Sequence, residues 1–147
     1  MKKLTFFILI LLSFFSCSNK SNKNVHEEVL TRHESGNKKE VLYYIIKDDG
    51  SKDYVRETLY YDEGMKHLDG PIADGKRNGA FETYYKSGAL MSKGTFVNGV
   101  REGDAFTYYE NGNVKYQGVY VNGKECGIWK FYKENGDLIK EVNKDLR

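Results

Sequence analysis

The sequence predicts an all-β fold built from stacked hairpin repeats. Glycines recur every 24 residues, hairpin turn signals recur with them, and the segments between the turns are rich in strand-forming Tyr, Phe, Val and Thr. Thirteen of the fifteen glycines fall in four such columns, and a fixed period of roughly 20–50 residues is typical of repeat architectures. The columns are Gly64, Gly88, Gly112 and Gly136; Gly70, Gly94 and Gly118; Gly75, Gly99 and Gly123; and Gly79, Gly103 and Gly127.

Residues 1–16 have the pattern of a secretory signal peptide. Lys2 and Lys3 precede an apolar run over residues 4–15, and the small residue Ser16 follows it. The run is too short to cross a bilayer, because a spanning helix needs about 20 apolar residues. We therefore expect this segment to direct export and to be removed from the mature protein.

Cys17 stands where the apolar run ends, and a polar stretch follows it at once. This arrangement resembles a bacterial lipobox, a signal in which the cysteine thiol receives a diacylglycerol and cleavage occurs just before the cysteine. Phe14 and Phe15 depart from the leucine and small residue that the pattern prefers. We expect Cys17 to be lipidated and to anchor the protein in a membrane of the cell envelope, in either leaflet, since each buried CH₂ contributes about 0.8 kcal/mol. An ordinary signal peptide with an incidental cysteine is the alternative.

After Cys17 the sequence predicts a flexible tether up to residue 31 and a repeat domain over residues 32–147. The tether is polar and lacks clear periodicity, although a short helix over residues 27–32 is an alternative for its last part. A degenerate first repeat occupies about residues 39–61, with a strand over 39–47, a turn at Asp49 and Gly50, and a returning strand over 54–61. Degenerate terminal repeats are typical of solenoids, which need capping units for solubility.

Regular repeats follow over about residues 60–142, and each is predicted to contain two strands and two turns. Asp74–Gly75, Asn98–Gly99 and Asn122–Gly123 are strong hairpin signals, because glycine adopts a positive φ without steric cost. Gly94 and Gly118 fall in mid-strand, where glycine weakens a strand unless something needs the space. We expect an aromatic side chain from a neighbouring strand to lie over each of them.

Alternation along the strands predicts two different faces of the sheet. We assign the tyrosine column Tyr84, Tyr108 and Tyr132 to one packed face, together with Gly94, Gly118, Phe96, Tyr120, Leu90 and Val114. The opposite face is the candidate binding face, because aromatic rings with polar tips are favoured at interfaces and can stack on sugars. Its residues are Tyr61, Tyr85, Tyr109, Trp129 and Phe81. The alternative is that these rings only brace a thin sheet.

The repeat unit resembles the bacterial variant of the MORN repeat. The last copy carries the motif in Gly127, Trp129, Tyr132, Asn135, Gly136 and Leu138, and the copy before it has Ala105 in place of the tryptophan. The resemblance implies an elongated, single-layer antiparallel β-sheet used for binding, and it supplies no catalytic residues. Proteins with this repeat are often labelled antitoxin components of toxin–antitoxin systems, a role that fits poorly with a lipobox because such an antitoxin acts in the cytoplasm.

The sequence contains no arrangement typical of a catalytic, metal or cofactor site. His26, His33 and His67 have no metal-ligand spacing with Cys126. Without Lys2 and Lys3, 21 basic residues balance 21 acidic ones, so nucleic acid is not an expected partner. We expect a non-catalytic, membrane-anchored scaffold that binds a protein at the envelope. Binding of glycan or peptidoglycan through the tyrosines, and an antitoxin role, are the alternatives.

Overall fold

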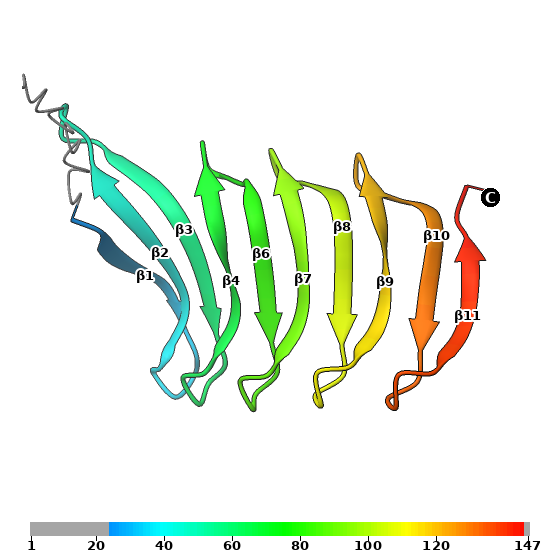
Figure 1. Cartoon of the computed structure of the whole chain (residues 1–147). Helices are drawn as coiled ribbons and strands as arrows, with labels where there is room; N and C mark the ends of the chain where they lie inside the picture. Colours follow the sequence, from blue (N-terminus) through cyan, green and yellow to red (C-terminus); the bar gives the residue numbers. More distant parts are fainter. Residues whose placement is uncertain (1–23, 146–147) are drawn as a thin grey trace, which may run out of the picture.

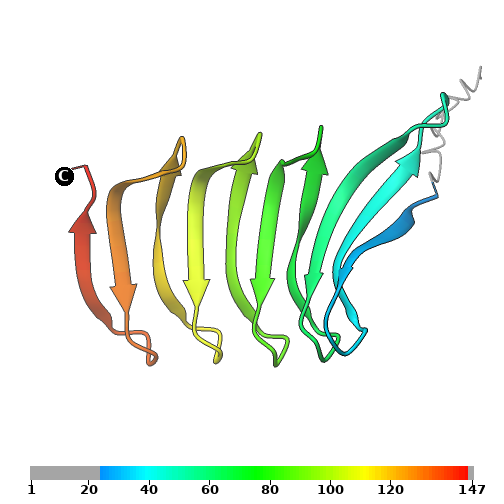
Figure 2. The same ribbon diagram turned by 180° about the vertical axis from the view of Figure 1, so that it is seen from behind.

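The computed structural model describes residues 24–145, and they form one open antiparallel β-sheet (Figure 1). The strand order is β1-β2-β3-β4-β6-β7-β8-β9-β10-β11, and the short strand β5 pairs with β4. The views from front and back show no second layer over either face of this part of the chain (Figures 1 and 2). The predicted all-β, single-layer fold is therefore confirmed.

The strands follow one another along the sheet in chain order. Their bounds are β1 His26–Arg32, β2 Lys38–Ile46, β3 Lys52–Tyr60, β4 Lys66–Ala73, β5 Lys76–Arg77, β6 Gly79–Tyr84, β7 Leu90–Val97, β8 Val100–Tyr108, β9 Val114–Val121, β10 Lys124–Tyr132 and β11 Leu138–Asn143. No helix long and apolar enough to cross a membrane occurs among residues 24–145.

The tether predicted up to residue 31 is wrong over its last part, and so is the alternative of a short helix there. His26–Arg32 form β1, which pairs with β2 from His26 opposite Tyr44 to Arg32 opposite Lys38. The segment shows little periodicity because most of its side chains are exposed on an edge strand, with only Glu28 and Val29 partly covered. The other predictions at this end of the chain, lipidation of Cys17 and the signal peptide over residues 1–16, concern residues outside the described part of the chain.

The predicted turns connect the strands as expected. Asp74, Asn98 and Asn122 adopt φ of 50°, 51° and 49°, and the glycines that follow them adopt φ of 70° to 87°. Two successive residues with positive φ are typical of the type I′ turn, whose twist matches that of the flanking strands. Glycine also occupies the other end of each hairpin, where the N–H groups of Gly88, Gly112 and Gly136 donate to carbonyls three residues earlier.

The two faces of the sheet differ from the predicted assignment. Phe81 is opposite Gly94, and Gly94 is opposite Ala105, so these residues share a face. We call this the glycine face, and it carries Gly70, Gly94 and Gly118 with Phe81, Ala105 and Trp129. The other, which we call the tyrosine face, carries Tyr60, Tyr84, Tyr108 and Tyr132.

A recurring β-bulge explains the error. The register shifts just before each member of the tyrosine column, which leaves one extra residue on the partner strand: His67, Met91, Lys115 and Ile139. A one-residue shift moves the side chains of a strand to the opposite face. Leu90 and Val114 therefore share the tyrosine face with Tyr84 and Tyr108, whereas the glycines later in the same strands lie on the other face.

The expectation of a ring over each mid-strand glycine is confirmed at Gly118 and wrong at Gly94, and the same packing occurs at Gly70. A β-carbon on Gly70 would collide with the ring of Phe81, and one on Gly118 would collide with the ring of Trp129. Both rings belong to the core, with 4% and 1% of their surface exposed. Gly94 has no ring over it, because the corresponding residue is Ala105. The core of this one-layer fold thus includes rings that lie over the backbone of the preceding strand, together with the buried side chains of Val41, Leu68 and Ala105.

Candidate binding surfaces of the repeat sheet

The second tyrosine of each repeat connects that repeat to the next. The hydroxyls of Tyr61, Tyr85 and Tyr109 donate to the backbone carbonyls of Tyr84, Tyr108 and Tyr132, over 2.9, 2.7 and 2.8 Å. All three rings are partly buried. These hydroxyls are therefore engaged within the sheet, and their geometry matches the bracing alternative. Contact of these rings with a partner stays a prediction.

Phe81 and Trp129, the other two residues of the predicted binding face, lie on the same face as these tyrosines but are buried. Around them, cationic side chains cover aromatic rings. The Arg77 guanidinium lies 5.1 Å from the Phe81 ring centre, and the Arg101 guanidinium lies 5.4 Å from Phe96 and 5.2 Å from Tyr120. Such cation–π contacts contribute about 0.5–1 kcal/mol at exposed sites. The glycine face is thus a packed row of rings and cations.

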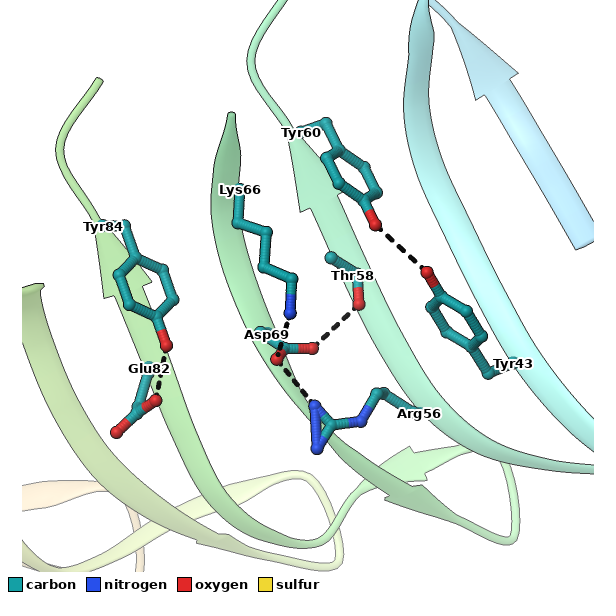
Figure 3. Close-up of polar contacts among 8 residues, drawn as sticks. All are labelled: Tyr43, Arg56, Thr58, Tyr60, Lys66, Asp69, Glu82 and Tyr84. Atoms are coloured by element: carbon teal, nitrogen blue, oxygen red, sulfur yellow. Dashed lines mark hydrogen bonds and ion pairs between the residues drawn. The ribbon is translucent and has the colours of Figure 1, made fainter. Parts of the chain in front are cut away.

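The tyrosine face carries a polar network near its N-terminal end (Figure 3). The carboxylate of Asp69 accepts hydrogen bonds from Arg56 at 2.6 Å, Thr58 at 2.8 Å and Lys66 at 3.1 Å. Partial burial opposes ionisation of Asp69, but these three hydrogen bonds outweigh it and lower its pKa. Thr58 is 1% exposed, so Asp69 also satisfies a hydroxyl that has lost contact with water.

Two members of the tyrosine column take part in the same polar surface (Figure 3). The Tyr84 hydroxyl donates to Glu82 at 2.5 Å, and this bond, with partial burial, raises the pKa of Tyr84 to about 12. The hydroxyls of Tyr43 and Tyr60 lie 3.0 Å apart, and burial is the main reason that the pKa of Tyr60 is raised. Both Tyr60 and Tyr84 therefore stay neutral at physiological pH.

Further along the tyrosine face, aliphatic side chains are exposed among charged ones such as Asp104. Five aliphatic side chains on the four strands β7 to β10 are each 38–47% exposed. We call this set the valine patch, and it consists of Val97, Val100, Val119, Val121 and Ile128. Two shallow hollows of about 170 and 210 Å³ lie beside it, and both include Phe106 and Asp104. Exposed apolar side chains gathered on one face are typical of protein interaction sites.

The sequence analysis missed the valine patch. Val119 and Val121 alternate with Gly118 and Tyr120, so their common face was visible, but a packed face and an exposed face cannot be distinguished from alternation alone. The strand register identifies the face on which these valines lie. Val97 is opposite Val100, and Val119 is opposite Cys126, on the tyrosine face.

A cavity of about 480 Å³ lies at the N-terminal end of the sheet beside the β1–β2 turn. Its lining includes His33, Leu59, Tyr61, His67 and Lys86. The rings of Tyr61 and His67 stack with centres 4.6 Å apart, and His33 Nε2 is hydrogen-bonded to the carbonyl of Tyr60 at 2.9 Å. These groups contact one another rather than converge on a common point, so we read this cavity as a gap between the capping repeat and the regular ones.

None of the described residues forms a group of three or more His, Cys, Asp or Glu side chains that could hold a metal ion. The thiol of Cys126 is free and partly buried, and it contacts the carbonyl of Lys124 at 3.5 Å.

Of three comparisons with known proteins, the one with family models agrees with the repeat pattern. No curated protein matches the sequence. Among solved structures, TarM has a TM-score of 0.37 and 18% identity, and the match covers 70% of this chain and 21% of TarM. A mutant of S. aureus TarM in complex with fondaparinux, α-GlcNAc-glycerol and UDP gives the same TM-score of 0.37 and identity of 18%, covering 71% of this chain and 21% of that one.

A third solved structure is a protein of unknown function from Bacteroides fragilis NCTC 9343. Its TM-score is 0.26 and its identity is 11%, and the match covers 85% of this chain and 95% of that protein. The match to TarM spans only 21% of the length of TarM.

A family model, that of the MORN repeat variant, matches residues 77–98, 101–122 and 125–143. These three segments follow the 24-residue spacing of the glycine columns and cover β6 to β11. Residues 77–143 of this chain therefore contain three consecutive repeats that match the MORN repeat variant.

Proposed function

We propose that this protein is a lipoprotein of the bacterial cell envelope whose repeat sheet is a non-catalytic scaffold that binds another protein. The observation that carries the proposal is the valine patch. It places five exposed aliphatic side chains on one face of consecutive repeats, in a part of the chain that no other described element covers. Loss of water from such side chains contributes about 25 cal/mol per Å² of apolar surface buried, which favours association with a complementary protein surface.

Repeat architecture supports the same proposal. Each repeat contacts only its neighbours, so the fold is an extended surface rather than an enclosed pocket, and extended surfaces are what repeat proteins use for binding. We base the proposed location at the cell envelope on the N-terminal end of the sequence. If Cys17 is acylated, the sheet is held close to the membrane by a short segment of about eight residues before β1 begins at His26, and its partner is then a protein of the envelope.

Charge substitution in the valine patch tests the proposal. Full-length, tagged protein is purified from detergent-solubilised native membranes as the wild type and as the double variant Val119→Asp, Val121→Asp. The matched control is Ala73→Asp, Ala80→Asp, which adds the same charges at two exposed apolar positions of the tyrosine face outside the patch. Circular dichroism verifies that all three proteins are folded.

We expect one protein, identified by mass spectrometry, to copurify with the wild type and the control and to be lost from the patch variant. An identical set of copurifying proteins in all three samples would show that the valine patch is not the binding surface.

A further inference from the structure

Comparison of equivalent positions in the repeats shows that one repeat lacks the aromatic ring that covers the mid-strand glycine in the others. Phe81 covers Gly70 and Trp129 covers Gly118, but the equivalent position over Gly94 holds Ala105. A β-carbon on Gly94 would meet only the Asp104 carbonyl at 3.9 Å and the Ala105 methyl at 4.0 Å. The glycine face therefore has an unfilled ring position in its middle repeat.

A cavity of about 160 Å³ borders Ala105 on the glycine face, next to the unfilled ring position over Gly94. Its lining comprises Met91 and Ser92 of β7, Arg101 and Ala105 of β8, and Tyr116 and Tyr120 of β9, with Phe106 and Thr107 beside them. Tyr116 and Tyr120 also pack against Trp129 of the next repeat, with ring centres 6.0 and 5.2 Å from the indole. The cavity is thus bordered by groups that already pack against an aromatic ring in the next repeat.

The positively charged side chain of Arg101 lines the cavity. The Arg101 guanidinium lies 5.2 Å from the Tyr120 ring centre, and Arg101 is exposed and forms no ion pair with the residues that the structure describes. Arg77, one repeat earlier, has a comparable position over Phe81 but is paired with Glu57 at 2.8 Å. Arg101 therefore retains donors and charge that an incoming ring can use.

We propose that the cavity beside Ala105 is a binding site for one aromatic side chain presented by a partner protein. The occupant is indicated by the chain itself, because Phe81 and Trp129 fill the equivalent positions with aromatic rings. At about 160 Å³ the cavity is smaller than the roughly 300–1,000 Å³ of sites for whole small molecules, and it matches a single anchoring side chain. The site lies on the opposite face from the valine patch, so this inference goes beyond the proposed function. Each of the two proposals can be tested and rejected without the other.

Methyl NMR of the full chain in detergent micelles tests the site, with N-acetyl-L-tryptophanamide as the probe and N-acetyl-L-leucinamide as the aliphatic control. We expect the methyl signals of Ala105 and Met91 to shift saturably with the tryptophan probe, with a Kd on the order of 1 mM for a single side chain. The methyl of Ala80, which is exposed on the tyrosine face, should not shift. Absence of a saturable shift, or an equal response to the leucine probe, would overturn the inference.

The variant Ala105→Phe supplies the missing ring from the chain itself. It should abolish the response of the Met91 methyl and raise the melting temperature, and an unchanged Kd in a folded variant would contradict the proposed site. If Ala105→Phe does not fold, Arg101→Gln carries the test, because loss of the guanidinium should weaken binding of the probe about threefold or more. An unchanged Kd in Arg101→Gln would then overturn the inference. Neither variant alters the valine patch, so copurification of its partner reports separately on the proposed function.

Discussion

The indole ring of Trp129 lies directly over Gly118, close enough that a β-carbon on that glycine would collide with three of its ring atoms. The two residues come from adjacent strands, and Trp129 is the most buried large side chain of the regular repeats at 1% exposure. A glycine in the middle of a strand, unfavourable by itself, is therefore what allows a one-layer sheet to bury a tryptophan. The same relationship joins Gly70 and Phe81.

This relationship predicts that two glycines of the same column, Gly118 and Gly94, respond differently to the same substitution. Gly118→Ala should lower the free energy of unfolding by about 1–3 kcal/mol or more, because the methyl group displaces the Trp129 ring. Gly94→Ala is the matched control. Its methyl meets no atom closer than 3.9 Å, so stability should be unchanged or rise by up to about 1 kcal/mol through reduced chain entropy. Urea unfolding followed by tryptophan fluorescence measures both, and equal effects would contradict the ring-over-glycine packing.

The tyrosine hydroxyls that connect repeats give a second prediction. Tyr109→Phe keeps the ring and removes the 2.8 Å hydrogen bond to the Tyr132 carbonyl, so it should cost about 0.5–1.5 kcal/mol. Tyr116→Phe removes a hydroxyl for which the structure gives no hydrogen bond to a described residue, and it should cost less. Thermal unfolding compares the two variants. A destabilisation by Tyr116→Phe as large as that by Tyr109→Phe would indicate that loss of the inter-repeat bond is not the cause.

Asp69 predicts a specific pH dependence of stability. The folded state lowers the pKa of Asp69, so its ionised form stabilises the fold above the unfolded value of about 3.9, and this contribution is lost as the pH falls through the folded pKa. Asp69→Asn should therefore lower the melting temperature at pH 7, with a deficit that shrinks as the pH falls below about 4. Asp104→Asn, on the same face and exposed, is the control and should show no such deficit. A deficit of Asp69→Asn that is constant between pH 7 and pH 3 would refute this role.

Acylation of Cys17 gives a prediction that concerns location. The wild-type protein should fractionate with membranes and show the mass of a lipidated N-terminus, whereas Cys17→Ala should stay unprocessed or enter the soluble fraction. Cys126→Ala changes the only other cysteine and should behave like the wild type. Recovery of the wild type as a soluble, unmodified protein would show that the lipobox interpretation is wrong.

The sequence was sufficient for the architecture because the features that set it are periodic. Asn98–Gly99 and Asn122–Gly123 fix two-residue turns, and Gly118 in mid-strand indicates a ring that lies over the backbone. Such signals repeat with the chain, so each copy supports the others.

The faces could not be predicted, because the strand pairs β3–β4, β6–β7, β8–β9 and β10–β11 each contain a bulge that nothing local in the sequence marks. Met91 and Lys115 are the extra residues in two of the strands, and each reverses the alternation between the tyrosine column and the mid-strand glycine. For this reason Phe81 and Trp129, predicted as binding residues, belong to the core, while the exposed Val119 and Val121 went unrecognised. Exposure depends on pairing across strands, and alternation within one strand does not report it.

Binding of a partner protein to the valine patch can be tested by site-specific photo-crosslinking of the full chain in its native cells. A benzoylphenylalanine at Val119 probes the patch, and one at Glu125, which is exposed on the glycine face of the adjacent strand, is the matched control. We expect a crosslinked species of one defined mass from Val119 that is absent or much weaker from Glu125. Equal yields from the two positions, or a crosslink from Glu125 alone, would show that the partner does not bind through the valine patch.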